Sequence, residues 1–190
     1  MKKVLLGLSI FGLVGLINLN SSASAEPWFF HKFGELRSYH GHFLNVCGKA
    51  GYGPCRAVQY VIPAGGDRFF GSASLTIHRT AKGNYVVEIF IRALPDRPQG
   101  PISLMIVGDL IPLAKDQWRS GLVDGVNVAE TFHITDAGLN ERIVALMKAK
   151  NKLRVIYEGG TGSINFSLIG LKSALQAQEA LKQKLSSSRQ

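Results

Sequence analysis

Short segments in which apolar and polar residues alternate dominate the chain after residue 38. In the clearest of them, residues 85–92, every second side chain from Tyr85 to Ile91 is apolar, which predicts a half-buried strand. The turn-forming residues 80–84 precede it and predict a hairpin with a strand in residues 69–78. Further strands are expected at 39–46, 56–62, 102–107, 130–134, 153–157 and 164–168.

Two segments have helical spacing instead. Apolar side chains in residues 139–147 recur three or four positions apart, Asp136 is placed to cap this helix, and Asn151 is placed to end it in a left-handed conformation. Residues 170–185 predict an amphipathic C-terminal helix with Leu171, Ala174, Leu175 and Leu181 on its apolar side.

Turn and loop residues separate these elements. Three prolines in residues 94–101 exclude a central strand, and residues 108–121, with Pro112 and Trp118, predict a loop. Asp124-Gly125 predicts a tight hairpin, and the glycines of residues 159–162 predict another turn.

Many short strands with two helices predict a mainly β fold, an antiparallel β-sandwich or open barrel with one short internal helix and a C-terminal helix. We see no internal repeat and no linker within residues 38–190, so we expect a single domain there, preceded by an arm of residues 26–37.

The first 25 residues have the layout of a secretory signal peptide. Lys2 and Lys3 precede an apolar run over residues 4–19, and Ala23-Ser24-Ala25 forms a small-x-small cleavage site. An uncleaved anchor is the alternative, but 16 apolar residues are short for a membrane span. We expect cleavage after Ala25 and a periplasmic or secreted protein with no transmembrane segment.

The mature chain is basic. Without the two lysines of the leader it has 20 basic and 13 acidic residues, a net charge of +7. Such a chain could meet anionic lipid, acidic glycan or nucleic acid, although a solvated surface is the simpler interpretation. Peripheral membrane contact could use Lys172, Lys182 and Lys184 on the C-terminal helix, whose apolar side is rather expected to pack on the sheet.

Cys47 and Cys55 flank a segment that contains three glycines and one proline and can turn back on itself. In an oxidising compartment such a pair forms a disulfide. A metal site is poorly supported, because the nearby ligands are only His40 and His42, with His78 and His133 farther along the chain.

The arm contains four aromatic residues within six positions, Trp28, Phe29, Phe30 and Phe33. They either pack on the domain or form an exposed contact patch.

No pattern of catalytic residues stands out, and no cofactor is expected. Gly71-Ser-Ala-Ser74 lacks the second glycine of a nucleophile elbow, the glycines at 159–162 lack the lysine of a phosphate loop, and Asp109 and Asp116 carry no further sign of a glycosidase pair. Basic residues lie beside aromatic residues at 37–40 and 68–70, but this signal is weak and the export signal argues against it, so nucleic acid is not an expected partner.

The order of several short motifs resembles the invasion-associated locus B family of exported bacterial proteins. The motifs cover residues 43–175 and are Phe43-Leu-Asn-Val-Cys-Gly48, Pro54-Cys55-Arg-Ala-Val-Gln59, Leu110-Ile-Pro-Leu113, Val123-Asp-Gly125 and Phe166-Ser-Leu-Ile-Gly-Leu171-Lys-Ser-Ala174-Leu175.

The chain departs from this family at several positions. Members often carry a second cysteine pair, and both of those cysteines are absent here, at Phe132-His-Ile-Thr135 and Gly138-Leu139. Phe43 and Leu171 stand where Trp and Phe are frequent. The resemblance implies a β-sandwich-like envelope protein, linked in some pathogens to host-cell invasion, and it implies no catalytic residues.

These observations predict an exported, non-enzymatic envelope protein that binds a protein or a component of the envelope or host surface. The alternatives are a periplasmic structural or chaperone-like factor and, with less support, a hydrolase of an envelope polymer.

If the leader is processed as expected, the exported chain begins at Glu26 and its two cysteines are oxidised. N-terminal sequencing and intact mass measurement of the exported protein check this directly. A full-length chain that still carries Met1, recovered from the cytoplasm with reduced cysteines, would contradict it.

Overall fold

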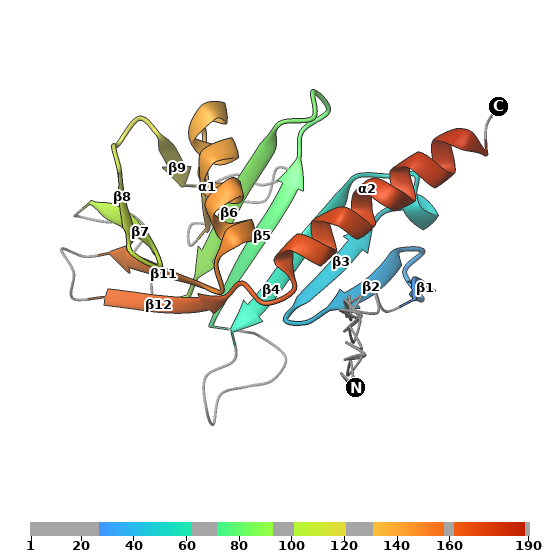
Figure 1. Cartoon of the computed structure of the whole chain (residues 1–190), viewed down its shortest axis with the longest axis horizontal. Coiled ribbons are helices and arrows are strands. Elements are labelled where there is room, and N and C mark those ends of the chain that lie inside the picture. Colours follow the sequence, from blue (N-terminus) through green and yellow to red (C-terminus); the bar gives the residue numbers. More distant parts are fainter. Residues whose placement is uncertain (1–26, 62–71, 93–100, 121–130, 158–161, 189–190) are drawn as a thin grey trace, which may run out of the picture.

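Two antiparallel sheets and two helices make up the described part of the chain (Figure 1). The computed structural model describes residues 27–61, 72–92, 101–120, 131–157 and 162–188. One sheet has eight strands in the order β1-β2-β3-β4-β5-β6-β10-β9, and the other has four in the order β12-β11-β7-β8. In the described part of the chain these sheets are not closed into a barrel. The predicted class, mainly β and antiparallel with one internal and one C-terminal helix, is therefore confirmed.

The larger sheet consists of β1 (Phe29–Phe30), β2 (Leu36–His40), β3 (Phe43–Cys47), β4 (Cys55–Val61), β5 (Ala73–Arg79), β6 (Tyr85–Ile91), β9 (Trp118–Ser120) and β10 (Thr131–Ile134). The smaller sheet consists of β7 (Ile102–Ile106), β8 (Asp109–Leu113), β11 (Lys152–Tyr157) and β12 (Gly162–Ser167). The helices are α1 (Ala137–Ala149) and α2 (Leu171–Ser187), and a short 3-10 turn, η1 (Lys49–Gly51), links β3 to β4.

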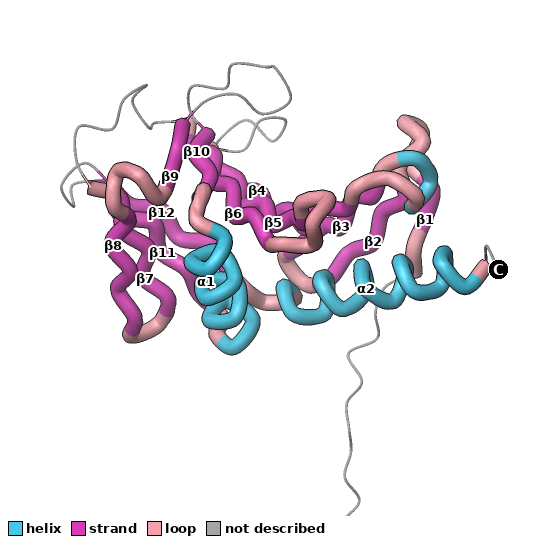
Figure 2. The backbone as a smooth tube through the Cα atoms, turned by 90° about the horizontal axis from the view of Figure 1, so that it is seen from above, coloured by secondary structure: helices cyan, strands magenta, loops and turns pink. Residues whose placement is uncertain are grey.

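Both helices cover the same face of the eight-stranded sheet (Figure 2). Strand β6 shows the effect most clearly, because Tyr85, Val87, Ile89 and Ile91 are buried while the residues between them are half-buried. The buried side chains of this face join those of α1, α2 and the smaller sheet in one apolar cluster. The alternation in the sequence thus marks the face that folding removes from water.

Helix α1 binds the backbone of β6 in the part of that strand that extends beyond its pairing with β10. Asp136 caps the helix by accepting from the Leu139 amide at 2.6 Å, as predicted. The buried side chain of Asn140 accepts from the Val87 amide at 2.9 Å, and Glu141 accepts from the Tyr85 amide at 3.0 Å. Two strand amides beyond the end of β10 thereby keep partners, which buried backbone groups require.

Helix α2 rests on β2 and β3 through polar as well as apolar contacts. The fully buried Asn45 donates to the Ala174 carbonyl at 2.9 Å and accepts from Gln178 at 2.7 Å. The predicted apolar side of the helix (Leu171, Ala174, Leu175 and Leu181) is buried. Because Asn45 would lose these two helix partners if the helix moved, this contact sets the position of α2 along the sheet.

Two glycines allow the start of α2 to touch the turn between β2 and β3. The His42 amide donates to the Ile169 carbonyl at 3.0 Å. Gly41 and Gly170 have φ of +55° and +94°, and a Cβ on Gly170 would collide with the His40 carbonyl. Only glycine combines this backbone conformation with such a close approach.

Three predictions at this level were wrong. Residues 39–46 do not form one strand, because the turn at Gly41 separates β2 from β3. The predicted loop over 108–121 contains β8 and β9; Pro112 fits there because β8 is an edge strand, where a missing amide costs no sheet hydrogen bond. Helix α1 ends at an extended Lys150 (φ −124°) rather than at a left-handed Asn151.

Some predictions lie outside the described residues. They are the signal peptide at 1–25, the proline-rich loop at 94–100, the Asp124-Gly125 hairpin and the turn at 159–161. Neither helix in the described ranges has both the length and the apolar character needed to cross a membrane.

The contact between Gly170 and the β2–β3 turn predicts a strong effect of Gly170→Ala. We expect it to lower the free energy of unfolding by about 3 kcal/mol or more, because a left-handed alanine and a collision with backbone are both introduced. Gly83→Ala is the matched control, since Gly83 has φ +89° but open space around it. It should cost only about 1 kcal/mol. Urea denaturation checks both values, and equal losses would contradict the proposed contact.

Candidate contact surface on the open face of the sheet

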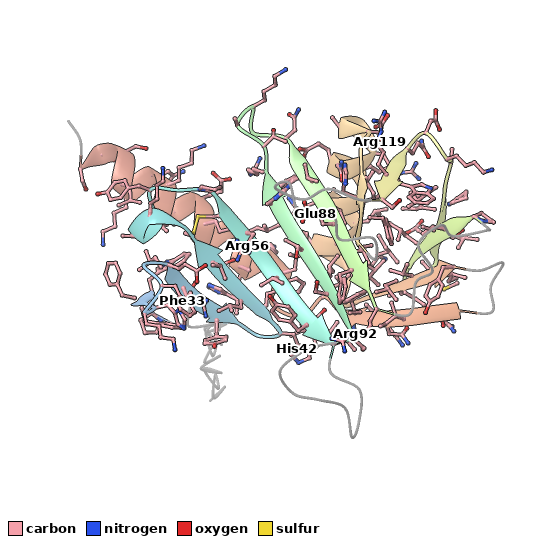
Figure 3. All side chains as sticks on the ribbon, turned by 180° about the vertical axis from the view of Figure 1, so that it is seen from behind. Phe33, His42, Arg56, Glu88, Arg92 and Arg119 are labelled. Atoms are coloured by element: carbon pink, nitrogen blue, oxygen red, sulfur yellow. A yellow bond between two sulfur atoms is a disulfide. The ribbon has the colours of Figure 1, made fainter. Side chains whose placement is uncertain are left out.

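The face of the eight-stranded sheet opposite the helices carries a mixed set of aromatic, basic, polar and aliphatic side chains, of which Val46 and Val58 are buried. Figure 3 looks onto this face, with Arg56, Glu88 and Arg119 across it. We call it the outer face and define it by the outward positions of the strands, which are Arg37, Tyr39, Leu44, Val46, Arg56, Val58, Tyr60, Ser74, Thr76, His78, Val86, Glu88, Phe90, Arg119 and His133.

Strand register brings these residues into rows that run across the sheet. In one row Glu88 lies between Thr76 on β5 and His133 on β10, and His133 lies opposite Arg119 on β9. In the next row Arg56 lies opposite His78, whose Nε2 is 3.7 Å from the Glu88 carboxylate. Side chains that are opposite in register lie close enough to act together on a bound surface.

Aromatic side chains stand at the margin of the outer face. Tyr39 and Tyr60 are 46% and 58% exposed, and Phe29 stacks on Tyr39 with ring centroids 5.8 Å apart. Exposed rings that lie against each other, as Phe29 and Tyr39 do, form a continuous apolar surface suited to contact with another molecule.

The aromatic residues of the arm do not all have the same surroundings: one packs on the domain and the others are exposed. Trp28 is half-buried against the small cluster of Leu36, Cys47 and Leu181, so it packs on the domain. Phe30 and Phe33 are each 72% exposed. A contact role for Phe29, Phe30 and Phe33 stays a prediction.

Glu35 organises the basic side chains next to the arm. Its carboxylate accepts from the Arg37 guanidinium and lies 3.8 Å from Arg56. The half-buried Glu35 therefore orients two arginines toward the outer face, at a small stabilisation typical of surface pairs.

A disulfide joins Cys47 and Cys55, which confirms the predicted bridge. The two residues face each other at the end of β3 and the start of β4. Cys47 is fully buried with Leu36 and Leu181, so the bridge closes the loop that supports the C-terminal half of α2.

The histidines that the sequence offered as metal ligands lie apart. His40 is buried beside Ser38, with its Nε2 2.9 Å from the serine hydroxyl, whereas His42 is exposed in the next turn. His78 and His133 lie on the outer face. No group of three or more potential ligands among the described residues could hold a metal ion.

The candidate catalytic positions have ordinary surroundings. Asp109 and Asp116 are exposed at the start of β8 and in the turn after it, and the Asp116 carbonyl accepts from Thr135. Ser74 lies within β5, and the hydroxyl of Ser72 donates to the Val61 carbonyl.

No family model and no curated protein matches this chain. Among solved structures, the fold is similar to the crystal structure of invasion associated protein b from Bartonella henselae. The TM-score is 0.54 at 16% sequence identity, and the match covers 77% of this chain and 98% of that chain. At this identity the likeness shows the fold alone. The resemblance found from the sequence motifs is thus supported at the level of the fold.

Sequence reasoning did not find the outer face as a surface. Alternation placed Glu88 on the polar side of its strand, but the neighbours of that residue depend on register. Arg56, His78 and His133 come from three strands whose pairing no local signal in the chain specifies.

Loss of the disulfide should destabilise the protein measurably. Closing a loop of this length contributes about 2–3 kcal/mol, so a Cys47→Ala/Cys55→Ala variant should unfold at a lower urea concentration. Reducing the unmodified protein with dithiothreitol is the control, because it removes the bond without removing side chains. Unchanged stability after complete reduction, verified by thiol counting, would contradict this expectation.

Proposed function

We propose that this protein is an exported, non-enzymatic binding protein that contacts an acidic surface of a protein partner in the cell envelope or on a host cell. The contact would be made by the outer face together with Phe29, Phe30 and Phe33 of the arm. The observation that carries the proposal is the concentration of exposed tyrosine and arginine on the one sheet face that the helices leave uncovered.

The side-chain types favour a protein partner. Tyr60 is 58% exposed, and the side chain of Arg56, four residues earlier on the same side of β4, is 50% exposed. Tyrosine and arginine dominate the binding energy of protein interfaces because they combine large contact area with directed hydrogen bonds. Phe29 and Tyr39 extend the same surface toward the arm.

The charges favour an acidic partner. Arg37, Arg56 and Arg119 lie on the outer face, and the one carboxylate among its defining residues is that of Glu88. Glu35, beside it, already accepts from Arg37. A basic surface speeds encounter with an acidic one and discriminates against basic partners.

Two further observations support a role outside the cytoplasm. The leader-like residues 1–25 predict export, and the Cys47–Cys55 disulfide is typical of oxidising compartments. The solved structure with a similar fold is that of an invasion associated protein, so we extend the proposal to contact with host cells.

The proposal predicts that Arg56→Ala/Tyr60→Ala weakens partner capture. Mature protein of residues 26–190 is immobilised and exposed to detergent-solubilised envelope or host-membrane extract, and the captured protein is then purified for a binding titration. We expect at least about tenfold weaker binding by the variant, about 1.4 kcal/mol, because hot-spot side chains are removed. Binding should also weaken as salt rises.

The matched control is Arg142→Ala/Tyr52→Ala, which removes the same residue types from exposed positions outside the outer face. It should bind as the unmodified protein does. A Phe30→Ala/Phe33→Ala variant separately measures how much the arm contributes to the affinity for the partner. Equal losses in the control and in Arg56→Ala/Tyr60→Ala, or no loss in either, would overturn the assignment of the outer face.

A further inference from the structure

A cleft lies between α1 and α2 on the side of the sheet opposite the outer face. Figures 1 and 2 both show the two helices beside each other there. The cavity has a volume of about 570 Å³, and its lining includes Tyr85, Lys148, Lys172 and Leu175. This volume is within the range of sites that hold small organic molecules.

Arg79 is held at the cleft by several contacts. Its guanidinium lies 4.0 Å from the centroid of the Tyr85 ring and donates to the Tyr85 hydroxyl at 2.8 Å. It also donates to the Gly83 carbonyl at 2.7 Å, and its Nε lies 3.0 Å from the Glu179 carboxylate. These contacts hold the Arg79 guanidinium in place, and it in turn orients the phenol of Tyr85.

Tyr85 is prepared to donate a hydrogen bond. Its oxygen accepts from Arg79, and no residue in the described ranges accepts from its hydroxyl. Burial raises the pKa of Tyr85 above its ordinary value, while the Arg79 charge opposes this shift. The phenol consequently keeps its proton at neutral pH and can donate it to a bound acceptor.

Two lysines add positive charge at the rim. Lys148 and Lys172 are exposed, and neither forms an ion pair with any residue that the structure describes. The Lys148 ammonium is 5.8 Å from the centre of the Tyr85 ring. The carboxylate that lines the cleft, Glu179, is already paired with Arg79. Three cations thus face one carboxylate, and every uncommitted polar group at Tyr85, Lys148 and Lys172 is a donor.

Four of the remaining lining residues are apolar, and Gln176 and Gln183 of α2 add two neutral amides. Ala145 and Ala149 of α1 face Leu175 and Ala180 of α2 across the cleft. Donors at one part of a cavity and short apolar side chains around it suit a molecule with an anionic head and a compact apolar body.

We propose that the cleft between α1 and α2 binds a small organic anion whose phosphate or carboxylate group is held by Lys148, Lys172 and the Tyr85 hydroxyl. This site is separate from the outer face, so it goes beyond the proposed function and does not depend on it.

The test titrates the mature protein, labelled with nitrogen-15, with phenyl phosphate, benzoate and the neutral benzyl alcohol, and follows amide shifts of α1, α2 and Tyr85 by NMR. We expect saturable shifts at the cleft with at least one of the two anions and none with benzyl alcohol. The two anions distinguish a phosphate from a carboxylate site.

Matched variants locate the binding. Lys148→Gln/Lys172→Gln should weaken anion binding at least tenfold, and Tyr85→Phe should weaken it by a smaller factor. Lys150→Gln/Lys184→Gln removes the same charge from exposed positions that do not line the cleft, and it should leave binding unchanged. Equal weakening in both double variants, equal binding of benzyl alcohol, or no saturable shift with either anion would overturn the proposal.

Discussion

The burial of one face of the eight-stranded sheet beneath α1 and α2 is the constraint on which the rest of this structure depends. A wide antiparallel sheet has two faces, and the described helices lie on one of them. One hydrogen bond positions each helix on the sheet. Asn140 of α1 accepts from the Val87 amide of β6, and Asn45 of β3 donates to the Ala174 carbonyl of α2. The close approach at Gly170 then ties the beginning of α2 to the β2–β3 turn.

This arrangement separates two kinds of surface. The outer face is broad and combines rings with arginines, as suits another protein. The side that the helices cover contains a cleft instead, which lies between α1 and α2 and is lined by Tyr85. Arg79 connects the β5–β6 hairpin to α2 through Glu179, so the position of the cleft and the position of the helix are linked by one side chain. A small ligand and a macromolecular partner would accordingly meet opposite sides of the sheet.

The sequence predicted most elements and few of their neighbours. Alternation identified β6 and the hairpin before it, and Asp136 marked the start of α1, because these signals depend only on local spacing. The prediction of one strand over residues 39–46 was wrong because the residues on both sides of the tight turn have strand-like composition. Glycine is required at position 41 of that turn because of its contact with the distant Ile169. The prediction of a loop around Pro112 was wrong because an edge strand accepts proline. That β8 is an edge strand follows from the order of strands in the sheet, which the sequence does not show.

The candidate sites were harder to predict for the same reason. Cys47 and Cys55 are close in sequence, so their bridge was predictable. The four arm aromatics were recognisable as a group, but only packing separates the half-buried Trp28 from the exposed Phe30. The rows around Glu88 and the donors around Tyr85 draw on strands and helices far apart in the chain, and long-range register is not encoded in any one segment.

Hydroxyl-radical footprinting of the mature protein, free and bound to its captured partner, tests the central claim about the outer face most directly. Oxidation of Tyr39 and Tyr60 should fall in the complex, while that of Tyr52, exposed beside the disulfide, should stay unchanged. Protection of Tyr52 without any change at Tyr39 and Tyr60 would contradict the account.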